Sequence, residues 1–416
     1  MTTVRRIGLS LGADICWPRS FEGILRKWNP TVKVGGEAIR FEVERVTIEP
    51  FDLRQPVKYD LVIDRLTHWY ANTREWIKKA VIMNDLYVFN NPWAVQSMEK
   101  QTTYCAMMRL GFPIPETWLV PPKDYEPKPD LQRTLTSYAK LFDLEKIGNL
   151  VGFPLFMKPY DGGGWVGVSG VKNAEELKKA YETSGKFVMH LQKAVEGWSH
   201  FVRGIGIGPQ VRVIQYDPDQ PLHARYTDKA DHLPQRDMDV MRRMVLTINA
   251  FFGWDFNSCE ALGKPGGTWS PIDFANPCPD SQVTSLHRHW PWLVLAKLRW
   301  ALFCAATKRK FRRNLDWEPF FEIAAEGGTF EERLARYEAL AHQRFDTARF
   351  EEFCATQLGG LEDVAHEFFG TAEARQAVRD KVAALYPEHE VDEFTDRFWM
   401  GVQTWRNQES KAAKKV

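Results

Sequence analysis

The sequence predicts an α/β protein with more than one domain and a helical C-terminal region. The chain has 416 residues, whereas one ordinary domain has about 100–200. Residues 1–95 alternate short apolar strand patterns with helical patterns, an order that is typical of parallel sheets. From residue 285 onward, long amphipathic helical patterns continue toward the last residues.

The N-terminal segment ends one of its strands at a group of polar and aromatic side chains. We expect strands over 6–11, 59–64 and 86–90, and a helix over 73–83. In an open parallel sheet, ligands bind beyond the carboxyl ends of the strands. Arg65, His68 and Trp69 follow the second strand and are therefore candidate substrate contacts. The alternative is a surface loop with a packed tryptophan.

A glycine-rich turn lies between two strands in the middle of the chain. In FPLFMKPYDGGGWVGV, a strand over 154–158 leads into three consecutive glycines, and a second strand follows over 166–171. Glycine backbones can approach phosphate oxygens closely and can adopt positive φ. This strand–turn–strand order differs from a Walker loop, which opens a helix. The turn is either a phosphate-binding loop or a plain glycine-rich hairpin.

A second hairpin carries paired carboxylates. The strands expected over 258–262 and 269–274 enclose a Gly-Gly turn and are expected to be antiparallel. Glu260 lies on the first strand, Asp273 lies on the second, and Asn276 follows it. Two carboxylates and an amide that face one point form an oxygen-ligand set that suits Mg²⁺ beside phosphate oxygens. Taken singly, each carboxylate is more often an exposed strand residue.

The other elements of this region follow from apolar periodicity and from turn residues. We expect helices over 93–110, 135–150, 173–181 and 234–252, a loop over 121–134, a strand over 187–192, and an antiparallel pair of strands over 201–207 and 211–216. Gly111 and Gly253 mark the ends of the first and last of these helices.

Composition and cysteine usage exclude several classes of protein. Apolar residues make up 44% and charged residues 26% of the chain, which excludes a largely disordered protein. The net charge of +1 does not indicate a nucleic-acid binder. The six scattered cysteines have no metal-ligand spacing and are expected to be reduced. Because we find neither a signal-peptide pattern nor an apolar stretch of the about 20 residues of a membrane span, we expect a cytoplasmic protein.

A basic segment follows the carboxylate hairpin. Residues 281–315 contain eight Lys or Arg residues, no acidic residue and several tryptophans. Such a segment can bind an anionic partner or a membrane surface. Alternatively, it packs its apolar face on the core and leaves its charges in solvent. We favour the second interpretation, because most amphipathic helices bury one face.

Taken in order, these segments resemble the ATP-grasp superfamily, most closely its ribosomal-protein glutamate ligases and glutathione synthetases. The resemblance covers residues 60–280 and rests on YDLVIDR, on NNPWAVQSMEK with LGFPIPETW, on GFPLFMKPYDGGGWVGV, on HLQKAVEG, and on CEAL with GTWSPIDFANPCPD. Each motif alone is weak, whereas the ordered set is specific. The resemblance implies a Rossmann-like domain over 1–95, a two-lobed ATP-grasp core over 96–284, and a helical extension over 285–416.

The resemblance also assigns residues to the nucleotide and the metal. Lys100 and Lys158 match phosphate-binding lysines of the family. The remaining nucleotide-binding matches lie in the glycine loop and between the two lobes: Gly162, Gly163, Gly164, Gly167, Gln192, Lys193, Val195 and Glu196. The hairpin residues Glu260, Asp273 and Asn276 match its Mg²⁺ ligands. The family usually has Glu-x-Asn on the second strand, and a bulge can compensate for the longer spacing here.

The activity that the resemblance implies is an ATP- and Mg²⁺-dependent ligation, with Mn²⁺ as a substitute metal. The carboxylate of a small molecule or peptide takes the γ-phosphoryl group, and an amine or thiol then attacks the acyl phosphate. A positioned arginine suits the oxyanion of the second step. Arg225 is the first candidate, and Arg203 and Arg212 are the others. For any one arginine, a surface salt bridge is the alternative role.

Two other functions stay open at this point. A kinase on the same fold would phosphorylate a hydroxyl group, and a non-catalytic chain would bind ATP as a scaffold. The intact set of metal ligands argues against the scaffold. The sequence identifies neither the substrates nor the oligomeric state.

Overall fold

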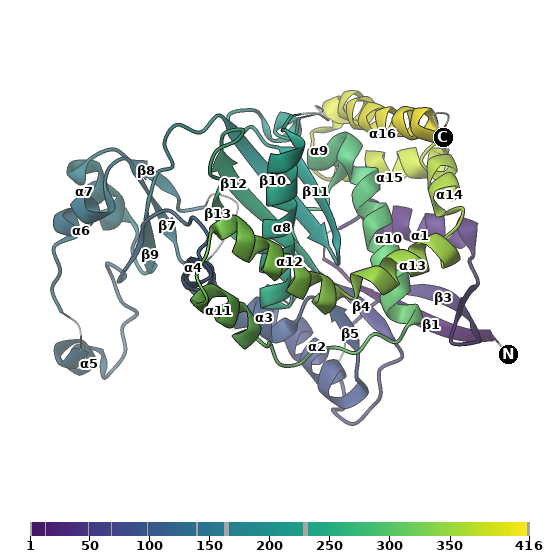
Figure 1. Ribbon diagram of the computed structural model, residues 1–416, viewed down its shortest axis with the longest axis horizontal. Helices are drawn as coiled ribbons and strands as arrows, with labels where there is room; N and C mark the ends of the chain where they lie inside the picture. Colours follow the sequence, from purple (N-terminus) through teal and green to yellow (C-terminus); the bar gives the residue numbers. More distant parts are fainter. Residues whose placement is uncertain are drawn as a thin grey trace. The chain divides into compact units, whose positions relative to one another are not determined.

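The α/β class that the sequence predicts is confirmed. The computed structural model describes residues 2–12, 14–48, 50–67, 69–97, 99–138, 140–161, 166–227 and 232–413. The chain forms two compact units (Figure 1). The first unit comprises Met1–Ser97, Val202–Ser258 and Pro277–Val416, and the second comprises Met98–Phe201 and Cys259–Asn276. Because the helical C-terminal region shares a unit with the N-terminal sheet, these limits differ from the three expected segments, and the three-part division stays a prediction.

The first unit begins with a five-stranded sheet in the order β2–β3–β1–β4–β5. Its strands are β1 (Thr2–Ser10), β2 (Val32–Val34), β3 (Glu37–Arg45), β4 (Leu61–Asp64) and β5 (Tyr87–Phe89). Strands β1, β4 and β5 are parallel, as predicted, and β3 is parallel to β1, whereas β2 is an antiparallel edge strand. The carboxyl ends of β1 and β4 therefore lie at the same edge, next to each other.

Helices cover this sheet through apolar residues. Helix α2 (Ala71–Asn84) packs Trp76, Ile77 and Val81 against Val62 and Val88 of β4 and β5. Helix α1 (Cys16–Trp28) contacts α10 (Trp290–Ala306), and α10 also contacts β1 and β4. Nearly every residue of α10 is buried. The basic, Trp-bearing segment therefore packs on the core, as the favoured interpretation expects, but its charges are not all left in solvent, because Lys297 of α10 is buried with the apolar residues.

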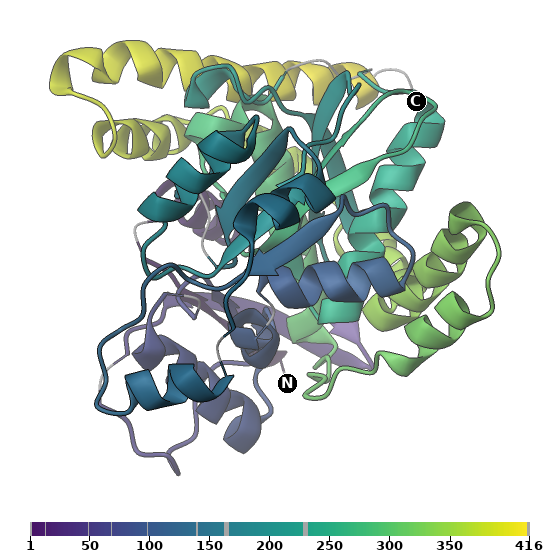
Figure 2. The ribbon, with the colours of Figure 1, turned by 90° about the vertical axis from the view of Figure 1, so that its left-hand side faces the viewer.

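The rest of the first unit is built around α8 (Gln235–Phe252). It contacts β11 (Gln210–Gln215), which pairs with β10 (His200–Ile207) in the antiparallel orientation that the sequence predicts. The absence of a side chain at Gly206 of β10 permits α8 to lie close to this strand, because a Cβ there would lie 2.4 Å from the Asn249 amide nitrogen of α8. Helix α12 (Phe330–Phe345) lies along α8, and Figures 1 and 2 show α15 (Ala372–Ala383) and α16 (Val391–Ala413) side by side.

The predicted helical C-terminal region is confirmed. Its elements are α9 (Val283–Leu286), η2 (His287–His289), α10, α11 (Glu318–Ala325), α12 (Phe330–Phe345), α13 (Thr347–Gln357), α14 (Leu361–Phe368), α15 (Ala372–Ala383), η3 (Glu388–Glu390) and α16 (Val391–Ala413). The breaks between these helices fall at Gly327-Gly328, Gly359-Gly360 and Pro387. In the part of the chain that the structure describes, we find no helix that combines the length and the apolarity of a membrane span.

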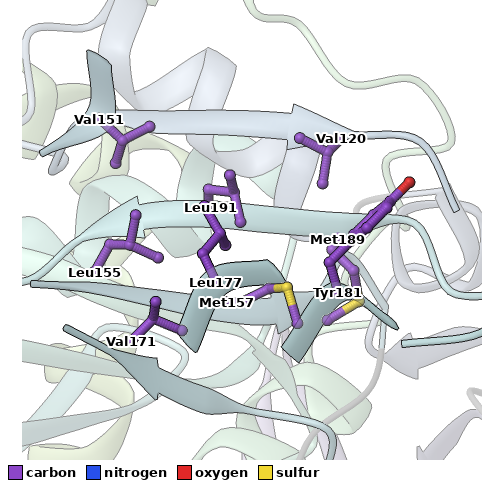
Figure 3. Packing of buried hydrophobic residues seen from close by; sticks show 9 residues of the cluster. All are labelled: Val120, Val151, Leu155, Met157, Val171, Leu177, Tyr181, Met189 and Leu191. Carbon is purple, nitrogen blue, oxygen red and sulfur yellow. The ribbon is translucent and has the colours of Figure 1, made fainter. Parts of the chain in front are cut away.

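The second unit contains a four-stranded sheet in the order β6–β9–β7–β8. Its strands are β6 (Thr117–Val120), β7 (Leu155–Pro159), β8 (Ser169–Val171) and β9 (Met189–Lys193), and its helices are α4 (Lys100–Arg109), α5 (Leu131–Tyr138), α6 (Leu144–Val151) and α7 (Ala174–Thr183). Figure 3 shows Leu177 and Tyr181 of α7 beside Leu155, Met157 and Leu191 of the sheet. One face of this sheet thus forms the core with α6 and α7.

Strands β10 and β11 continue into a sheet with β12 (Phe256–Gly263) and β13 (Ser270–Pro277), in the order β11–β10–β12–β13. The carboxylate hairpin is therefore present as two neighbouring strands. The limits between the two units fall within β10, β12 and β13.

Two expected helices are each divided in two. The pattern over 93–110 forms α3 (Pro92–Ser97) and α4, because the backbone of Glu99 is extended before α4 begins. The pattern over 135–150 forms α5 and α6, and α5 starts inside the expected loop. Asp143 caps α6 by accepting a hydrogen bond from the Lys146 amide at 2.9 Å, and this cap fixes where the second helix begins. Helix α1 and strands β2, β3 and β6 were not predicted from the sequence.

Candidate functional site

The polar face of the second unit's sheet carries the first part of the candidate site. Residues alternate between the two faces of a strand. Leu155 and Met157 of β7 point into the core, so Phe156 and Lys158 lie on the opposite face. The antiparallel register of β7 and β9 pairs Lys158 with His190 and Phe156 with Gln192. Four side chains of different chemistry therefore share one face.

Lys158 is held by neutral acceptors. Its Nζ donates to the Gln192 side-chain oxygen at 2.7 Å and to the Ile272 carbonyl at 3.0 Å. The Gln192 amide nitrogen in turn donates to the Thr117 hydroxyl at 2.8 Å. Burial lowers the pKa of Lys158 to about 8, although the negative charge of Asp273 acts in the opposite direction. The ammonium also lies 5.2 Å from the centre of the Tyr104 ring, within range of a cation–π contact.

Lys100, the first residue of α4, forms an ion pair with Asp273 of β13. Its Nζ lies 3.0 Å from Oδ2 of Asp273, and the lysine is 8% exposed. Tyr104 lies one helical turn later on the same face of α4 and donates to the Ile272 carbonyl at 2.8 Å. Helix α4 is therefore tied to β13 by two side chains, and both phosphate-lysine candidates lie beside this strand.

The three metal-ligand candidates lie on the hairpin of β12 and β13. Glu260 is the only residue of β12 that is not fully buried, and Asp273 accepts a hydrogen bond from Asn276 at 3.2 Å. The negative charges of Asp273 and Glu260 both favour the charged form of Lys158 and so raise its pKa against the effect of burial. Across the described ranges, we find no group of three or more His, Cys, Asp or Glu residues that could hold a metal. The set is two carboxylates and one amide.

His190 is a buried neutral histidine in the same site. Its Nε2 lies 3.1 Å from the Gln101 side-chain oxygen, which assigns the proton to Nε2. Among the described residues, its Nδ1 has no hydrogen-bond partner. Burial and the nearby charges of Lys158 and Lys100 lower its pKa to about 3. The ring therefore adds no positive charge to the two lysines at neutral pH.

The expected phosphate loop is described only in part. Gly162, Gly163 and Gly164 lie outside the described residues. Gly167 has a φ of +73°, and a Cβ on it would lie 2.9 Å from the Pro159 ring. Only glycine fits there without strain. Strands β7 and β8 on either side of the turn pair antiparallel, as predicted.

The segment expected to recognise the nucleotide follows β9. Gln192 is buried, whereas Lys193 and Val195 are partly buried and Glu196 is exposed. The Lys193 amide donates to the Glu116 carbonyl at 2.9 Å, which fixes the end of β9 beside β6. The structure therefore turns the Gln192 side chain toward Lys158, while the segment continues outward to Glu196.

The three candidate catalytic arginines belong to the first unit. Arg203 donates to the Ser258 hydroxyl at 2.9 Å and to the Tyr226 hydroxyl. Arg212 donates to Nδ1 of His289 at 3.1 Å, and burial lowers the pKa of that histidine to about 3.

The third arginine, Arg225, lies on the segment after η1 (Leu222–Ala224). It donates to the Gln220 carbonyl at 3.0 Å and to the Tyr216 hydroxyl at 3.2 Å. Arg203 and Arg212 project from neighbouring strands, whereas Arg225 is held within its own loop. Which of the three serves catalysis stays a prediction.

The residues after β4 form a second candidate region of the first unit. Arg65 donates to Asp14 at 3.0 Å, to the Pro279 carbonyl at 2.6 Å and to the Cys278 carbonyl. Its guanidinium thus links the end of β4 to the chain after β13. Trp69 is 67% exposed, and His68 lies outside the described residues.

Sequence reasoning missed four side chains of the polar face: Tyr104, Thr117, Phe156 and His190. Alternation in FPLFMKP could have placed Phe156 on the same face as Lys158. The others depend on the register of β7 with β9 and on the side of α4 that meets β13, which no local pattern specifies.

Comparisons with known proteins give three kinds of result. A search for protein-family models finds no match. The chain is similar to D-alanine–D-alanine ligase of Bacillus anthracis in complex with ATP, with a TM-score of 0.47 and 14% identity over 78% of this chain and 100% of that one. It is also similar to a RimK domain ATP-grasp protein of Sphaerobacter thermophilus, with a TM-score of 0.45 and 12% identity over 70% of this chain and 97% of that one.

A curated relative shares sequence with part of the chain. The chain is 26% identical over 208 residues to a D-alanine–D-alanine ligase of Lactobacillus helveticus, which covers 45% of this chain and 54% of that protein. The chain thus spans about half the length of this curated relative.

Proposed function

We propose that this protein is an ATP-dependent ligase of the ATP-grasp class that joins a carboxylate to an amine. The observation that carries the proposal is the gathering of Lys100, Lys158 and Asp273 within the second unit. Phosphoryl transfer depends on positioning and charge neutralisation, which two lysines beside two carboxylates can supply. The partial sequence similarity to a D-alanine–D-alanine ligase supports the same reaction class.

The nucleotide would bind on the polar face of the sheet β6–β9–β7–β8. Phe156 is 36% exposed beside Gln192, so its ring offers a surface on which a base can stack. Lys158 and Lys100 would bind phosphate oxygens, and the turn that contains Gly167 would close over them. The backbone of Gln192–Val195 would recognise the edge of the base, with Glu196 as a candidate for the ribose.

The donor set of the hairpin fits a magnesium ion. Mg²⁺ prefers oxygen ligands and usually takes one or two protein carboxylates beside phosphate oxygens. Glu260 and Asp273 would hold the ion, and Asn276, which contacts Asp273, would complete the set. When bound, such an ion neutralises charge on the transferred phosphoryl group.

The reaction would proceed in two steps. The substrate carboxylate attacks the γ-phosphoryl group, ADP leaves, and the acyl phosphate is then attacked by the amine with release of phosphate. Lys158 and Lys100 would stabilise the charge on the phosphoryl oxygens in the first step. In the second step, the tetrahedral oxyanion needs a donor, for which Arg203, Arg212 and Arg225 are the candidates.

A screen for ADP release tests the proposal. The protein is incubated with ATP, Mg²⁺ and pairs of carboxylates and amines, with D-alanine first because of the relative, and products are identified by mass spectrometry. Asp273→Asn and Glu260→Gln should lower turnover by about 100-fold or more. Glu352→Gln, an exposed carboxylate on α13, is the matched control and should keep full activity. Unchanged turnover in both hairpin variants would contradict the metal assignment.

A kinase that phosphorylates a hydroxyl group is the alternative for the same site. Hydroxylamine captures an acyl phosphate as a hydroxamate, whereas a phosphate ester does not react with it. A hydroxamate that forms only with ATP and substrate supports the ligase. ADP formation with a stable phosphorylated product supports the kinase, and absence of ADP across the screen supports a scaffold.

A further inference from the structure

The ion pair between Lys100 and Asp273 joins two side chains that the proposed function assigns to different ligands. Lys100 is proposed to bind a phosphate, and Asp273 is proposed to bind a metal ion. Oδ2 of Asp273 accepts from Lys100 at 3.0 Å, and Oδ1 accepts from Asn276 at 3.2 Å. A divalent cation bound to either oxygen would lie within a few ångströms of the lysine ammonium, since its own bonds are about 2.1 Å long. Like charges at that distance repel strongly where the side chains are largely shielded from water.

From this contact we infer that Lys100 is a positioning residue that couples metal binding to nucleotide binding. While Lys100 neutralises Asp273, the carboxylate binds a free divalent cation weakly. The phosphates of a bound nucleotide are a second anion for the Lys100 ammonium. When the ammonium moves from Asp273 to the phosphates, Asp273 becomes available to the metal ion that accompanies the nucleotide. The inference rests on the proposed function, because it takes Asp273 as a metal ligand and Lys100 as a phosphate ligand.

The surroundings of Lys100 permit this exchange. The lysine is the first residue of α4, and Tyr104 holds the helix against the Ile272 carbonyl at 2.8 Å. The four-carbon side chain can therefore move its ammonium by several ångströms while the backbone stays in place. The contact of Asp273 with Asn276 uses the other carboxylate oxygen, so departure of Lys100 from Oδ2 does not require it to break.

Lys158 cannot replace Lys100 in this role. Its ammonium donates to the Gln192 side chain at 2.7 Å and to the Ile272 carbonyl at 3.0 Å, both of which are neutral. It is thus already held in position without a carboxylate partner. The two lysines have different tasks: Lys158 is fixed before the nucleotide arrives, whereas Lys100 changes its partner.

Binding of Mn²⁺ alone to the full-length protein tests the inference. Free Mn²⁺ is measured by electron paramagnetic resonance in the absence of nucleotide. Lys100→Met should bind Mn²⁺ at least about tenfold more tightly than the wild type, because Asp273 loses its internal cation. Lys100→Arg keeps the ion pair and should resemble the wild type. The double variant Lys100→Met/Asp273→Asn should lose the gain.

A matched control separates this effect from a general change of charge. Lys123 forms an exposed ion pair with Glu182 at 2.7 Å in the same unit, so Lys123→Met removes one positive charge at a distance from the hairpin. It should leave Mn²⁺ affinity at the wild-type value. Circular dichroism and thermal melting show whether each variant is folded.

A failure of the coupling role of Lys100 can be distinguished from a failure of the proposed function. A second titration measures Mn²⁺ binding in the presence of a non-hydrolysable ATP analogue. If this ternary complex forms and is lost in Asp273→Asn, but Lys100→Met binds Mn²⁺ alone no better than the wild type, the coupling role is overturned and the metal assignment stands. If the ternary complex is indifferent to Asp273→Asn, the proposed function fails together with the coupling.

Discussion

The ammonium of Lys158 donates a hydrogen bond of 2.7 Å to the side-chain oxygen of Gln192, and the amide nitrogen of Gln192 donates one of 2.8 Å to the Thr117 hydroxyl. Gln192 lies in a segment whose backbone was expected to recognise the nucleotide. The structure gives its side chain a different task, because both ends of the amide are bonded within the protein. The position of Lys158 therefore depends on a residue of the neighbouring strand and on one of the strand beyond it.

Removing a side chain from this series of hydrogen bonds should weaken nucleotide binding. Gln192→Ala removes the acceptor of a buried charged donor, a loss worth about 1.5–3 kcal/mol. We expect the dissociation constant for ATP to rise by about tenfold or more, as measured by isothermal titration calorimetry. Thr117→Val breaks only the outer bond and should have a smaller effect. Gln132→Ala on exposed α5 is the control, and an effect of the same size there would contradict the assignment.

Nucleotide affinity should also depend on pH through Lys158. Burial lowers the pKa of this lysine to about 8 in the free protein. Above that pH the amine is neutral, so binding of a polyanion that favours the ammonium requires the uptake of a proton. We expect the dissociation constant for ATP to rise by up to about tenfold per pH unit above pH 8. Lys158→Arg stays charged and should give a flat profile between pH 7 and 10; a profile as steep as that of the wild type would assign the effect to another group.

Acid should destabilise the protein through two histidines that are buried and neutral in the described part of the chain. His190 and His289 both have a pKa lowered from 6.5 to about 3. Between these values the unfolded chain binds more protons than the folded protein, so stability falls as the pH decreases from 6.5 toward 3. Each histidine contributes a slope of up to about 1.4 kcal/mol per pH unit.

Urea unfolding between pH 4 and 7 measures this slope. His190→Asn and His289→Asn should each make the dependence of the free energy of unfolding on pH shallower, by the slope that one histidine contributes. His389→Asn replaces a histidine whose side chain is 79% exposed and should leave the slope unchanged. Equal slopes in all four proteins would mean that other groups account for the sensitivity to acid.

The sequence predicted well those features that depend on local patterns. The strands β1, β4 and β5 and the helix α2 follow from short apolar runs and a helical period. The pairing of β12 with β13 brought Glu260 and Asp273 onto neighbouring strands, as their spacing indicated. Features that depend on long-range register were not predictable. The partners of Lys158 come from residues 34 and 114 positions away, and no periodicity specifies which strands become neighbours.

The basic segment after the hairpin illustrates the same limit. Its cationic composition allowed a partner-binding surface, yet the structure buries most of α10 and pairs its charges with side chains of the same chain. Lys297 is 0% exposed and lies 3.6 Å from the centre of the Trp17 ring, and Arg299 forms an ion pair with Glu362 at 2.6 Å. Composition counts charges, whereas their role depends on which side of the helix meets the core.

Lys297 itself gives the last prediction, since a buried amine is costly to keep. It donates to the Ser281 hydroxyl at 2.9 Å, and burial lowers its pKa well below the usual range. Lys297→Met keeps most of the side-chain volume and removes the amine, so the free energy of unfolding at pH 7 should be unchanged or higher by about 1–3 kcal/mol. Lys297→Ala leaves a cavity and should lose about 2–5 kcal/mol.

The pH dependence of the difference in free energy of unfolding between Lys297→Met and the wild type shows whether protonation of the buried amine causes it. The unfolded chain protonates Lys297 below its ordinary pKa of 10.5, whereas the folded protein resists protonation until a lower pH. The wild type therefore loses stability as the pH falls through that interval, and Lys297→Met does not. Urea unfolding at pH 7 and pH 9 should show a larger advantage of the methionine variant at pH 7. If Lys297→Met is as unstable as Lys297→Ala at both values, the buried amine instead contributes net stability through Trp17 and Ser281.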